Sequence, residues 1–430
     1  MAKELSFGER LGEPVAGNGL LHRRFFLQSG AAMAGTAAAA TAARAESIGA
    51  VSPSWMLKPG SGFTPYGMPS HWRDNIKRIL VSNAPPGREV TGSCRTPLQF
   101  LEGAITPAGL HYVRNHNGTP DIDPNKHELM IHGMVKQPLV FTVDSLMRYP
   151  MRSEIRFMEC AGNSGGISAA ATPQQVTAGD IHGLLSGSEW SGVKLSTLLD
   201  EAGLDPKATW ILAEGADSAG MSRSVPVWKA MDDAMIALYQ NGEPIRPEQG
   251  FPMRLLLPGF EGNTNVKWLR RLQVMDTPMY SRDETSRYTE LQPDGKAREF
   301  MLQMEPKSVI LKPSFGIDMQ GAGYYEISGL AWSGLGRVRR VDISADGGKS
   351  WTEAALSGPV LPKALTRFRL PWMWNGGPAV LMSRTTDEKG FVQPTRAQWV
   401  AQYAPRQNFH FNAIQSWSVA ADGKVSNTYV

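Results

Sequence analysis

The stretch Ile155-Arg156-Phe157-Met158-Glu159-Cys160-Ala161-Gly162-Asn163-Ser164-Gly165-Gly166 joins a short apolar run to a glycine-rich loop. The apolar run predicts a strand, and this strand brings Cys160 to the start of the loop. The glycines at 162, 165 and 166 allow the backbone to turn tightly and to approach a ligand closely. The stretch therefore predicts a fold that presents one thiolate to a large ligand.

Cys160 has three interpretations on these residues alone. It forms a disulfide with Cys94, the other cysteine of the chain, as exported proteins often do. Alternatively, Ser164 is a nucleophile, because residues 162–166 fit the G-x-S-x-G elbow; that elbow needs a helix directly after the serine, and residues 167–173 look too short before Pro173. In the third interpretation Cys160 binds a soft transition metal whose other ligands come from a cofactor. Composition does not decide among them.

Glu159-Cys160-Ala161-Gly162-Asn163 resembles the cysteine segment of the sulfite oxidase family of molybdopterin enzymes, in which that cysteine binds molybdenum. Tyr112-Val113-Arg114-Asn115-His116 resembles the family's Arg-Asn-His segment. Gly250-Phe251-Pro252-Met253-Arg254 resembles its Gly-Phe-Pro-x-Arg signature, and Val266-Lys267-Trp268-Leu269 the segment that follows. The resemblance implies an α+β fold, with a sulfite oxidase-like molybdopterin-binding domain followed by an all-β immunoglobulin-like sandwich domain.

The resemblance also implies roles for individual residues. Cys160 is the metal ligand, Arg114 binds the substrate, and Tyr288 donates a hydrogen bond near the metal's oxo group and passes protons. An arginine can donate two parallel hydrogen bonds to the oxygens of a small anion such as sulfite. The positions implied to bind the cofactor are Asn115, His116, Asp217, Arg254, Asn265, Val266 and Lys267.

One of these positions also has support from its neighbours in the sequence. Arg254 lies between Met253 and the apolar run Leu255-Leu256-Leu257, which is typical of a buried strand. A buried charge is costly unless an opposite charge meets it. The pattern therefore favours an anion-binding role for Arg254 over a place on the surface.

The implied cofactor is Mo-molybdopterin, with no heme in this chain, because covalent c-type attachment needs Cys-x-x-Cys-His and the cysteines at 94 and 160 stand far apart. Oxidation of a sulfur atom releases two electrons, so the implied partner is a c-type cytochrome subunit. The family uses its β domain to form dimers, which implies a homodimer of this subunit within a hetero-oligomer. The formal charge of +4 is spread along the sequence, which argues against nucleic acid as a partner, and no apolar run is long enough to span a membrane.

Two positions depart from the family pattern. Ser164 and Gly165 stand where typical sulfite oxidases carry arginines, and Gln249 replaces a histidine before Gly-Phe-Pro. The first change favours a less charged or carrier-bound sulfur substrate over free sulfite alone. In Ser164-Gly165, the proline-rich arm and the stretch 214–226, the chain most resembles the molybdenum subunit of sulfane dehydrogenases of the bacterial Sox sulfur-oxidising system. The alternatives are a molybdopterin-dependent periplasmic sulfoxide reductase and a metal-free periplasmic binding or assembly protein.

The 430 residues suffice for two sizeable cores. Residues 1–45 read as a twin-arginine signal peptide with Arg23-Arg24 and an Ala43-Arg44-Ala45 cleavage site, which predicts a periplasmic protein exported in folded form. Residues 46–95 are predicted to form a proline-rich arm, residues 96–300 the catalytic domain, and residues 301–430 the dimerising β domain.

Within these limits, several local patterns predict particular elements. The segment 128–135 is a predicted strand, and 194–202, 227–238 and part of 71–81 are predicted helices. A strand at 338–344 and another at 349–351 flank a turn, and Trp332, Trp351, Trp372 and Trp374 are predicted to fill the sandwich core. His127 and His132 lie an odd number of residues apart along a strand, which argues against a shared metal ion.

Overall fold

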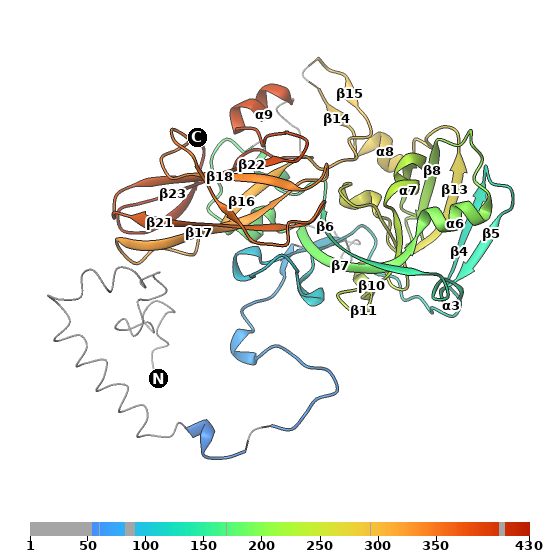
Figure 1. Ribbon diagram of the computed structural model, residues 1–430, viewed down its shortest axis with the longest axis horizontal. Helices are drawn as coiled ribbons and strands as arrows, with labels where there is room; N and C mark the ends of the chain where they lie inside the picture. The colour runs from blue at the N-terminus through green and yellow to red at the C-terminus, as the bar shows by residue number, and fades with distance from the viewer. Residues whose placement is uncertain (1–53, 60, 82–90, 169, 293, 404–408) are drawn as a thin grey trace. The chain divides into compact units, whose positions relative to one another are not determined.

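The computed structural model describes residues 54–59, 61–81, 91–168, 170–292, 294–403 and 409–430 (Figure 1). The predicted signal peptide, residues 1–45, lies outside the described residues. The chain divides into two compact units. Among the described residues, the smaller contains those between 54 and 75, 321–326 and 371–377, and the larger contains the others.

The described part of the smaller unit has little regular structure. It contains two single 3₁₀ turns, η3 (Ser54–Met56) and η4 (His71–Arg73). The Ser70 hydroxyl accepts a hydrogen bond from the Trp72 backbone N–H at 3.4 Å and so caps η4. The helix predicted within residues 71–81 is limited to this turn, and the segment instead ends in a strand, β1 (Ile79–Val81).

The first sheet of the larger unit carries the central cysteine. Its strands are β6 (Met151–Glu159), β7 (Leu185–Lys194), β10 (Met235–Gln240), β11 (Glu243–Pro244) and β12 (Arg254–Leu256). Strands β6 and β7 pair antiparallel over the full length of β6, from Met151 opposite Val193 to Glu159 opposite Leu185. Because β6 ends at Glu159, Cys160 is the first residue beyond the sheet. The predicted strand that delivers this cysteine to a loop is confirmed.

The larger unit contains a second five-stranded sheet, which includes β4, β5, β8 and β13 (Figure 1). Its order is β5-β4-β13-β8-β9, with β4 and β13 parallel and the other pairs antiparallel. The bounds are β4 (Glu128–Gly133), β5 (Leu139–Thr142), β8 (Trp210–Gly215), β9 (Ser222–Pro226) and β13 (Leu269–Met275). Helix α6 (Leu195–Ala202) buries Leu195, Leu198, Leu199 and Ala202 in the main core. The helix predicted over residues 194–202 is thus confirmed.

The predicted helix over residues 227–238 is wrong in its second half. Helix α7 covers only Val227–Asp232, and Met235 begins strand β10. Residues 235–238 are all buried, because Ile236 and Leu238 pack in the main core while Met235 and Ala237 pack in a second cluster on the other face of the sheet. A strand covered on both faces has a continuous apolar run, which periodicity alone does not distinguish from a buried helix.

A three-stranded sheet positions the arginine segment. Strands β1, β2 (Gly92–Arg95) and β3 (Val113–Asn115) pair antiparallel, with Cys94 opposite Val113 and Ser93 opposite Arg114. Both Cys94 and Cys160 are free thiols. The disulfide interpretation of Cys160 is therefore wrong.

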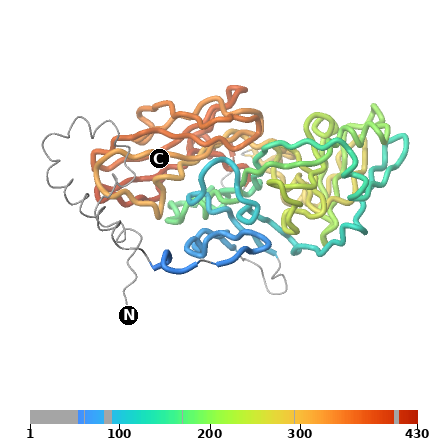
Figure 2. Tube along the Cα trace, turned by 60° about the horizontal axis from the view of Figure 1, so that its bottom comes forward, coloured from blue at the N-terminus to red at the C-terminus, as the bar shows by residue number. Residues whose placement is uncertain are grey.

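The C-terminal strands form an immunoglobulin-like sandwich, drawn in orange to red in both views (Figures 1 and 2). One sheet has the order β16-β17-β21-β20 and the other β19-β18-β22-β23-β24. Their bounds are β16 (Lys307–Lys312), β17 (Gly323–Trp332), β18 (Val338–Ser344), β19 (Thr352–Glu353), β20 (Ala355–Leu356), β21 (Thr366–Trp374), β22 (Ala379–Asp387), β23 (Ser416–Val419) and β24 (Val425–Thr428). The strand predicted at 338–344 is confirmed, and the next strand begins at Thr352, just after the predicted range.

The tryptophans of the sandwich divide into two groups. Trp332 and Trp374 are buried as predicted, whereas Trp351 and Trp372 are only partly buried. Trp417 on β23, which the prediction omitted, is fully buried and donates its indole N–H to the Ile310 carbonyl at 3.1 Å. Composition identifies tryptophans as core candidates, but the pairing of strands decides which of them face inward.

Short elements connect these sheets. They are α3 (Val143–Leu146), α4 (Gly165–Ser168), α5 (Ala178–His182), α8 (Arg282–Ser286), α9 (Arg396–Gln402), β14 (Glu290–Leu291), β15 (Ala297–Arg298), η5 (Leu98–Phe100), η6 (Ala108–Leu110), η7 (Pro247–Gln249) and η8 (Gly262–Thr264). Within the described ranges, no helix combines the length and the apolar content that crossing a bilayer requires.

The sheet that carries Cys160 depends on a glycine in its centre. Gly192 of β7 lies opposite both Arg152 and Ala237, and a Cβ atom there would approach the Ile236 carbonyl oxygen to 2.0 Å. We expect Gly192→Ala to lower the free energy of unfolding by about 1–3 kcal/mol, because the strands must move apart. Urea unfolding measures this loss. In the control Gly358→Ala the added Cβ meets nothing within 4 Å, so equal stability of the two variants would contradict the packing.

Candidate active site

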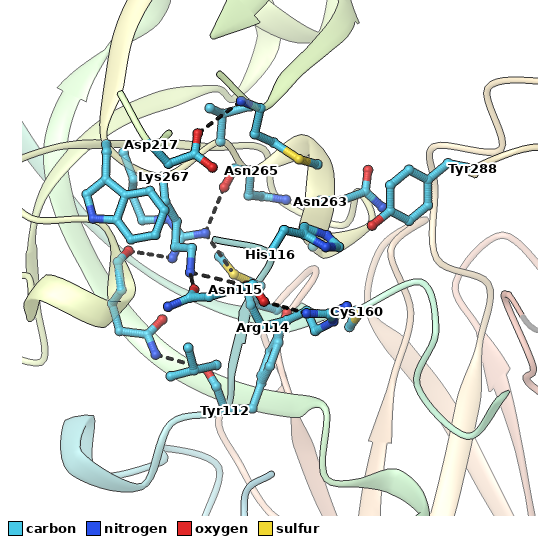
Figure 3. Close-up of a pocket in the computed structure, with 18 residues that line it drawn as sticks. Tyr112, Arg114, Asn115, His116, Cys160, Asp217, Asn263, Asn265, Lys267 and Tyr288 are labelled. Atoms are coloured by element: carbon cyan, nitrogen blue, oxygen red, sulfur yellow. Dashed lines mark hydrogen bonds between the residues drawn. The ribbon is translucent and has the colours of Figure 1, made fainter. Parts of the chain in front are cut away.

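One cavity in the larger unit is lined by every residue that the sequence assigned to the site (Figure 3). These residues lie on β3, after β6, after β8, on β12, before β13 and after α8. In Figure 3, Cys160 and Tyr288 lie toward one end of the cavity, and Asp217 and Lys267 lie toward the other. The structure thus brings together Cys160, Arg114, Tyr288, Asn115, His116, Asp217, Arg254, Asn265, Val266 and Lys267.

Two backbone hydrogen bonds hold Cys160 in place. Its N–H donates to the Leu184 carbonyl at 3.0 Å, and its own carbonyl accepts from the Asn163 N–H at 2.9 Å. Burial raises the pKa of the thiol, so a cation would be needed to favour the thiolate. Gly262 packs against this loop, since a Cβ there would lie 2.5 Å from the Tyr112 hydroxyl and 3.3 Å from Cys160 Cα.

Arg254 is a buried cation in the cavity wall. It is 2% exposed and donates from Nη1 to the Gln249 carbonyl and from Nη2 to the Asn265 carbonyl, each at 2.8 Å. Its Nε is buried and makes no hydrogen bond with any described residue. A buried guanidinium with a spare donor and no carboxylate partner favours an anionic ligand.

Lys267 adds a second positive charge beside Arg254. Its ammonium donates to the Glu248 carbonyl at 3.0 Å and to the Arg114 carbonyl at 3.3 Å, and it contacts the Asn115 side-chain oxygen. Burial, followed by the charge of Arg254, lowers the pKa of Lys267 to about 7. Asp217 is the one carboxylate among the residues that line the cavity, so cations predominate there. A bound phosphate would offset their repulsion.

The remaining cofactor positions supply polar groups held in place by the backbone. The Asp217 carboxylate accepts from the Met221 N–H at 3.0 Å, and the Asn265 side-chain oxygen accepts from the Leu257 N–H at 2.7 Å. Burial lowers the pKa of His116 to about 4, so its ring is neutral near pH 7 and retains one donor and one acceptor. Val266 is buried, and its carbonyl accepts from the Leu255 N–H at 2.9 Å.

Tyr288 lies between two neighbours that fix its ring. The Phe409 ring centroid is 5.3 Å away, and the Arg223 guanidinium carbon lies 4.8 Å from the centroid of the Tyr288 ring. Burial raises the pKa of Tyr288, so the phenol keeps its proton at neutral pH and can donate a hydrogen bond. This agrees with the donor role that the resemblance implies.

A second cavity, open to solvent, meets the first at Cys160. Arg114, His116, Cys160 and Tyr288 line both cavities. The second is otherwise lined by Gly162, Gly165, Gly166, Leu184, Ser286, Arg287 and Phe409. Cys160 thus lies where a ligand in the inner cavity would meet a molecule that enters from outside.

Ser164 does not face either cavity. Contrary to the sequence-based expectation, a helix does follow it, the single turn α4, and its hydroxyl lies 2.6 Å from His182 Nδ1. The residue is nevertheless 4% exposed and is also bonded to Lys307, at 2.9 Å. The elbow motif is present in the backbone, but its hydroxyl is enclosed in the protein interior, which excludes an accessible nucleophile.

Sequence reasoning missed several residues of the site. Tyr112, Met158, Asn263 and Trp268 also line the inner cavity, and all lie within or beside the motifs that carry the resemblance. Arg223 was missed for another reason: it is 1% exposed and bridges Glu261 at 3.0 Å and Glu284 at 3.6 Å, and no local pattern marks it as buried. Arg367, whose place the sequence left open, donates to the carbonyls of Gly103 and Leu101 and lines neither cavity.

The donors present fit Mo-molybdopterin. The thiol of Cys160 suits a soft metal, and the group of cations suits the pterin's phosphate. Two buried donors, Arg254 Nε and Asn263 Nδ2, have no hydrogen-bond partner among the described residues and are available to a polar ligand. The described residues contain no group of three or more His, Cys, Asp or Glu side chains placed to hold a metal by themselves, so a metal here needs ligands from a cofactor.

A buried acidic residue lies close to this site. Glu290 is 2% exposed, its carboxylate oxygens make no hydrogen bond with a described residue, and His410 Nε2 is 4.0 Å from Oε1. Burial raises the pKa of Glu290 from 4.5 to about 7. In the folded protein the Glu290 carboxyl therefore keeps its proton up to a pH of about 7.

This shift predicts how stability depends on pH. Because the pKa is raised on folding, the contribution of Glu290 is most favourable below pH 4.5 and is lost as the pH rises through about 7. We expect Glu290→Gln to gain stability relative to the parent protein over that range, by at most about 3 kcal/mol. Urea unfolding at several pH values measures the difference. The exposed Glu353→Gln is the control, and a pH-independent effect of Glu290→Gln would contradict the assignment.

Comparison with known proteins agrees with this geometry. Residues 116–282 match the oxidoreductase molybdopterin binding domain, and residues 298–416 match the Mo-co oxidoreductase dimerisation domain. Mitochondrial sulfite oxidase of Mus musculus is 33% identical over 281 residues, which are 61% of this chain and 51% of that protein. Nitrate reductase [NADH] 1 of Oryza sativa subsp. japonica is 32% identical over 319 residues, 66% of this chain and 34% of that protein. The chain thus spans about half the length, or less, of these two curated relatives.

A solved structure extends the similarity over nearly the whole chain. The crystal structure of the sulfane dehydrogenase SoxCD from Paracoccus pantotrophus matches with a TM-score of 0.85 and 44% identity, covering 89% of this chain and 98% of that chain. At this coverage the match includes most of residues 116–282 and most of residues 298–416. The chain therefore belongs to the sulfite oxidase family of molybdopterin oxidoreductases.

Proposed function

We propose that this protein is a periplasmic molybdopterin-dependent sulfite or sulfane dehydrogenase, which oxidises sulfite or protein-bound sulfane sulfur and passes the electrons to a c-type cytochrome. One observation carries the proposal: Cys160 lies where a cation-lined inner cavity meets a cavity open to solvent. The 44% identity to a sulfane dehydrogenase supports the choice of substrate. The twin-arginine pattern at Arg23-Arg24 supports export in folded form.

The inner cavity would hold the cofactor. Cys160 would supply the protein's thiolate ligand to molybdenum, and Arg254 and Lys267 would bind the phosphate of the pterin. Asn115, His116, Asp217 and Asn265 would read its ring donors and acceptors. When bound, the cofactor supplies oxygen-atom transfer and two-electron redox chemistry.

The side chains shared by both cavities would handle the substrate. Arg114 would donate hydrogen bonds to the oxygens of the sulfur compound and orient its sulfur toward the inner cavity. Tyr288, neutral and fixed by Phe409 and Arg223, would donate a hydrogen bond at the reacting oxygen and conduct the protons that water releases. Arg287 at the open cavity would add positive charge along the entry path.

The wall of the open cavity supports a bulky substrate. It includes Gly162, Gly165 and Gly166, and a Cβ at Gly166 would meet nothing within 4 Å. Because Ser164 faces the interior, this loop places no charged side chain over the cavity. Such a wall suits sulfur carried on a peptide or protein as well as free sulfite.

The partners follow from the same chemistry. Two electrons released at one centre need an acceptor, and we propose a c-type cytochrome on a separate subunit, as the motif for covalent heme attachment is not found in this sequence. Residues 96–300 would form the catalytic domain. Residues 301–430 would pair two copies of the subunit, as their match to the dimerisation domain suggests.

The first experiment tests the thiolate ligand. We expect Cys160→Ser to abolish sulfur-dependent reduction of cytochrome c, because serine is a poor ligand for a soft metal. The assay measures cytochrome reduction with sulfite and with a protein-bound sulfane, alongside the molybdenum content of the purified protein. Cys94→Ser, on β2 and outside both cavities, should keep full activity. Substantial turnover by Cys160→Ser would disprove the proposal, and a parent protein without molybdenum would favour a binding protein.

A second experiment tests the substrate arginine. We expect Arg114→Gln to lower kcat/KM by about 10- to 100-fold, because it removes charge-assisted hydrogen bonds to the substrate. Steady-state kinetics at saturating cytochrome measures the change. Arg270→Gln on β13 removes an arginine that lines neither cavity and should leave kcat/KM unaltered. Equal kinetics of Arg114→Gln and the parent protein would remove Arg114 from the substrate site.

A further inference from the structure

A cluster of buried polar side chains lies directly behind the Cys160 loop. Its members are at most 4% exposed: Glu159, Asn163, Ser164, His182, Lys307 and Trp332. The cluster includes the residue before Cys160 and the fourth residue after it. None of its side chains lines either of the two cavities. The roles proposed above for the site leave the cluster unexplained.

Glu159 is the centre of the cluster. Its Oε1 accepts from Asn163 Nδ2 at 2.8 Å and from Lys307 Nζ at 3.3 Å. Its Oε2 accepts from the indole N–H of Trp332 at 2.6 Å. Three donors therefore hold the carboxylate in one orientation, immediately before the proposed metal ligand.

Ser164 holds the other end of the loop. Its hydroxyl is bonded to Lys307 Nζ at 2.9 Å and to His182 Nδ1 at 2.6 Å. Its backbone has a φ of 66°, a left-handed conformation that glycine adopts more easily than serine. Backbone geometry alone would favour glycine at this position, so the hydroxyl explains the serine.

Two of the donors come from the C-terminal β domain. Lys307 lies on β16 and Trp332 on β17, both in the segment that matches the dimerisation domain. Burying an ammonium group is costly, and well-packed apolar side chains would join two domains at least as stably. A buried ion pair between domains is better explained by a need for defined geometry than by adhesion.

We propose that Lys307 and Trp332 are positioning residues of the active site. By holding Glu159 and Ser164, they fix both ends of the Cys160 loop and so set where the thiolate meets the metal. The C-terminal β domain then completes the catalytic loop in addition to its expected role in dimerisation. This inference rests on the proposed function only in taking Cys160 as the molybdenum ligand.

The chain contains a matched control for simple adhesion between the domains. Lys363, also in the C-terminal domain, contacts Asp233 of the catalytic part at 2.5 Å and is 20% exposed. Within the described part of the chain, its ammonium group bonds to Asp233 and makes no hydrogen bond or ion pair with the Cys160 loop. Lys363→Met therefore removes an interdomain ion pair without altering the cluster, while Lys307→Met removes one that includes it.

The experiment compares Lys307→Met, Trp332→Phe and Lys363→Met in the full chain loaded with cofactor. We expect the first two to alter the electron paramagnetic resonance spectrum of Mo(V), and to lower kcat at least about tenfold with KM changed less than about threefold. Lys363→Met should lose thermal stability but keep the parent spectrum and kcat. Parent spectra and kcat in both cluster variants would overturn the inference.

A double variant separates geometry from the cost of an unpaired charge. Glu159→Gln with Lys307→Met leaves no lone charge buried, so we expect it to recover stability relative to Lys307→Met. Its spectrum and kcat should remain altered, and their full recovery would overturn the inference. If Lys307→Met fails to fold, Trp332→Phe, which keeps the aromatic packing, decides by the same two readouts.

The outcomes distinguish this inference from the proposed function. A parent protein that contains molybdenum but does not oxidise sulfur compounds would overturn the proposed substrate, and the Mo(V) spectra would still decide the role of Lys307 and Trp332. A parent protein without molybdenum would overturn both.

Discussion

The burial of the Glu159 carboxylate at the end of β6 is the constraint on which the site depends. A carboxylate that is 1% exposed needs several donors, and they come from Asn163, Lys307 and Trp332. These hydrogen bonds join the loop that carries Cys160 to two strands of the β sandwich. The position of Cys160, one residue further along, follows from that contact.

The inner cavity, in contrast to the surroundings of Glu159, has more positive than negative side chains in its wall. Arg254 and Lys267 are held by carbonyl oxygens, which orient them, and neither forms an ion pair with a carboxylate of the described residues, although Asp217 and Glu248 lie near Lys267. The positive charges of the cavity therefore favour the binding of an anionic ligand. Behind the loop the Glu159 carboxylate is satisfied by protein donors, whereas in the cavity in front of it Arg254 Nε has no partner among the described residues.

Local sequence accounted for much of the fold. The run 155–159 forms the end of β6, and residues 195–202 form a helix whose apolar residues face the core. One error arose where both faces of an element are covered: residues 235–240 are a strand, although their continuous apolar run resembles a buried helix. The outcome for the four predicted core tryptophans was mixed because orientation depends on strand pairing, which lies outside any local window.

The sequence by itself determined the family and predicted which residues would line one cavity, because Cys160, Arg114, Arg254 and Lys267 each lie within a short contiguous motif. Only the tertiary structure decided that Lys307, 143 residues after Ser164, completes the loop that carries the cysteine. Lysine on a predicted strand normally lies at the surface, and nothing local signals that this one is buried. Burial and pairing of charges arise from contacts between distant segments, and these exist only once the chain has folded.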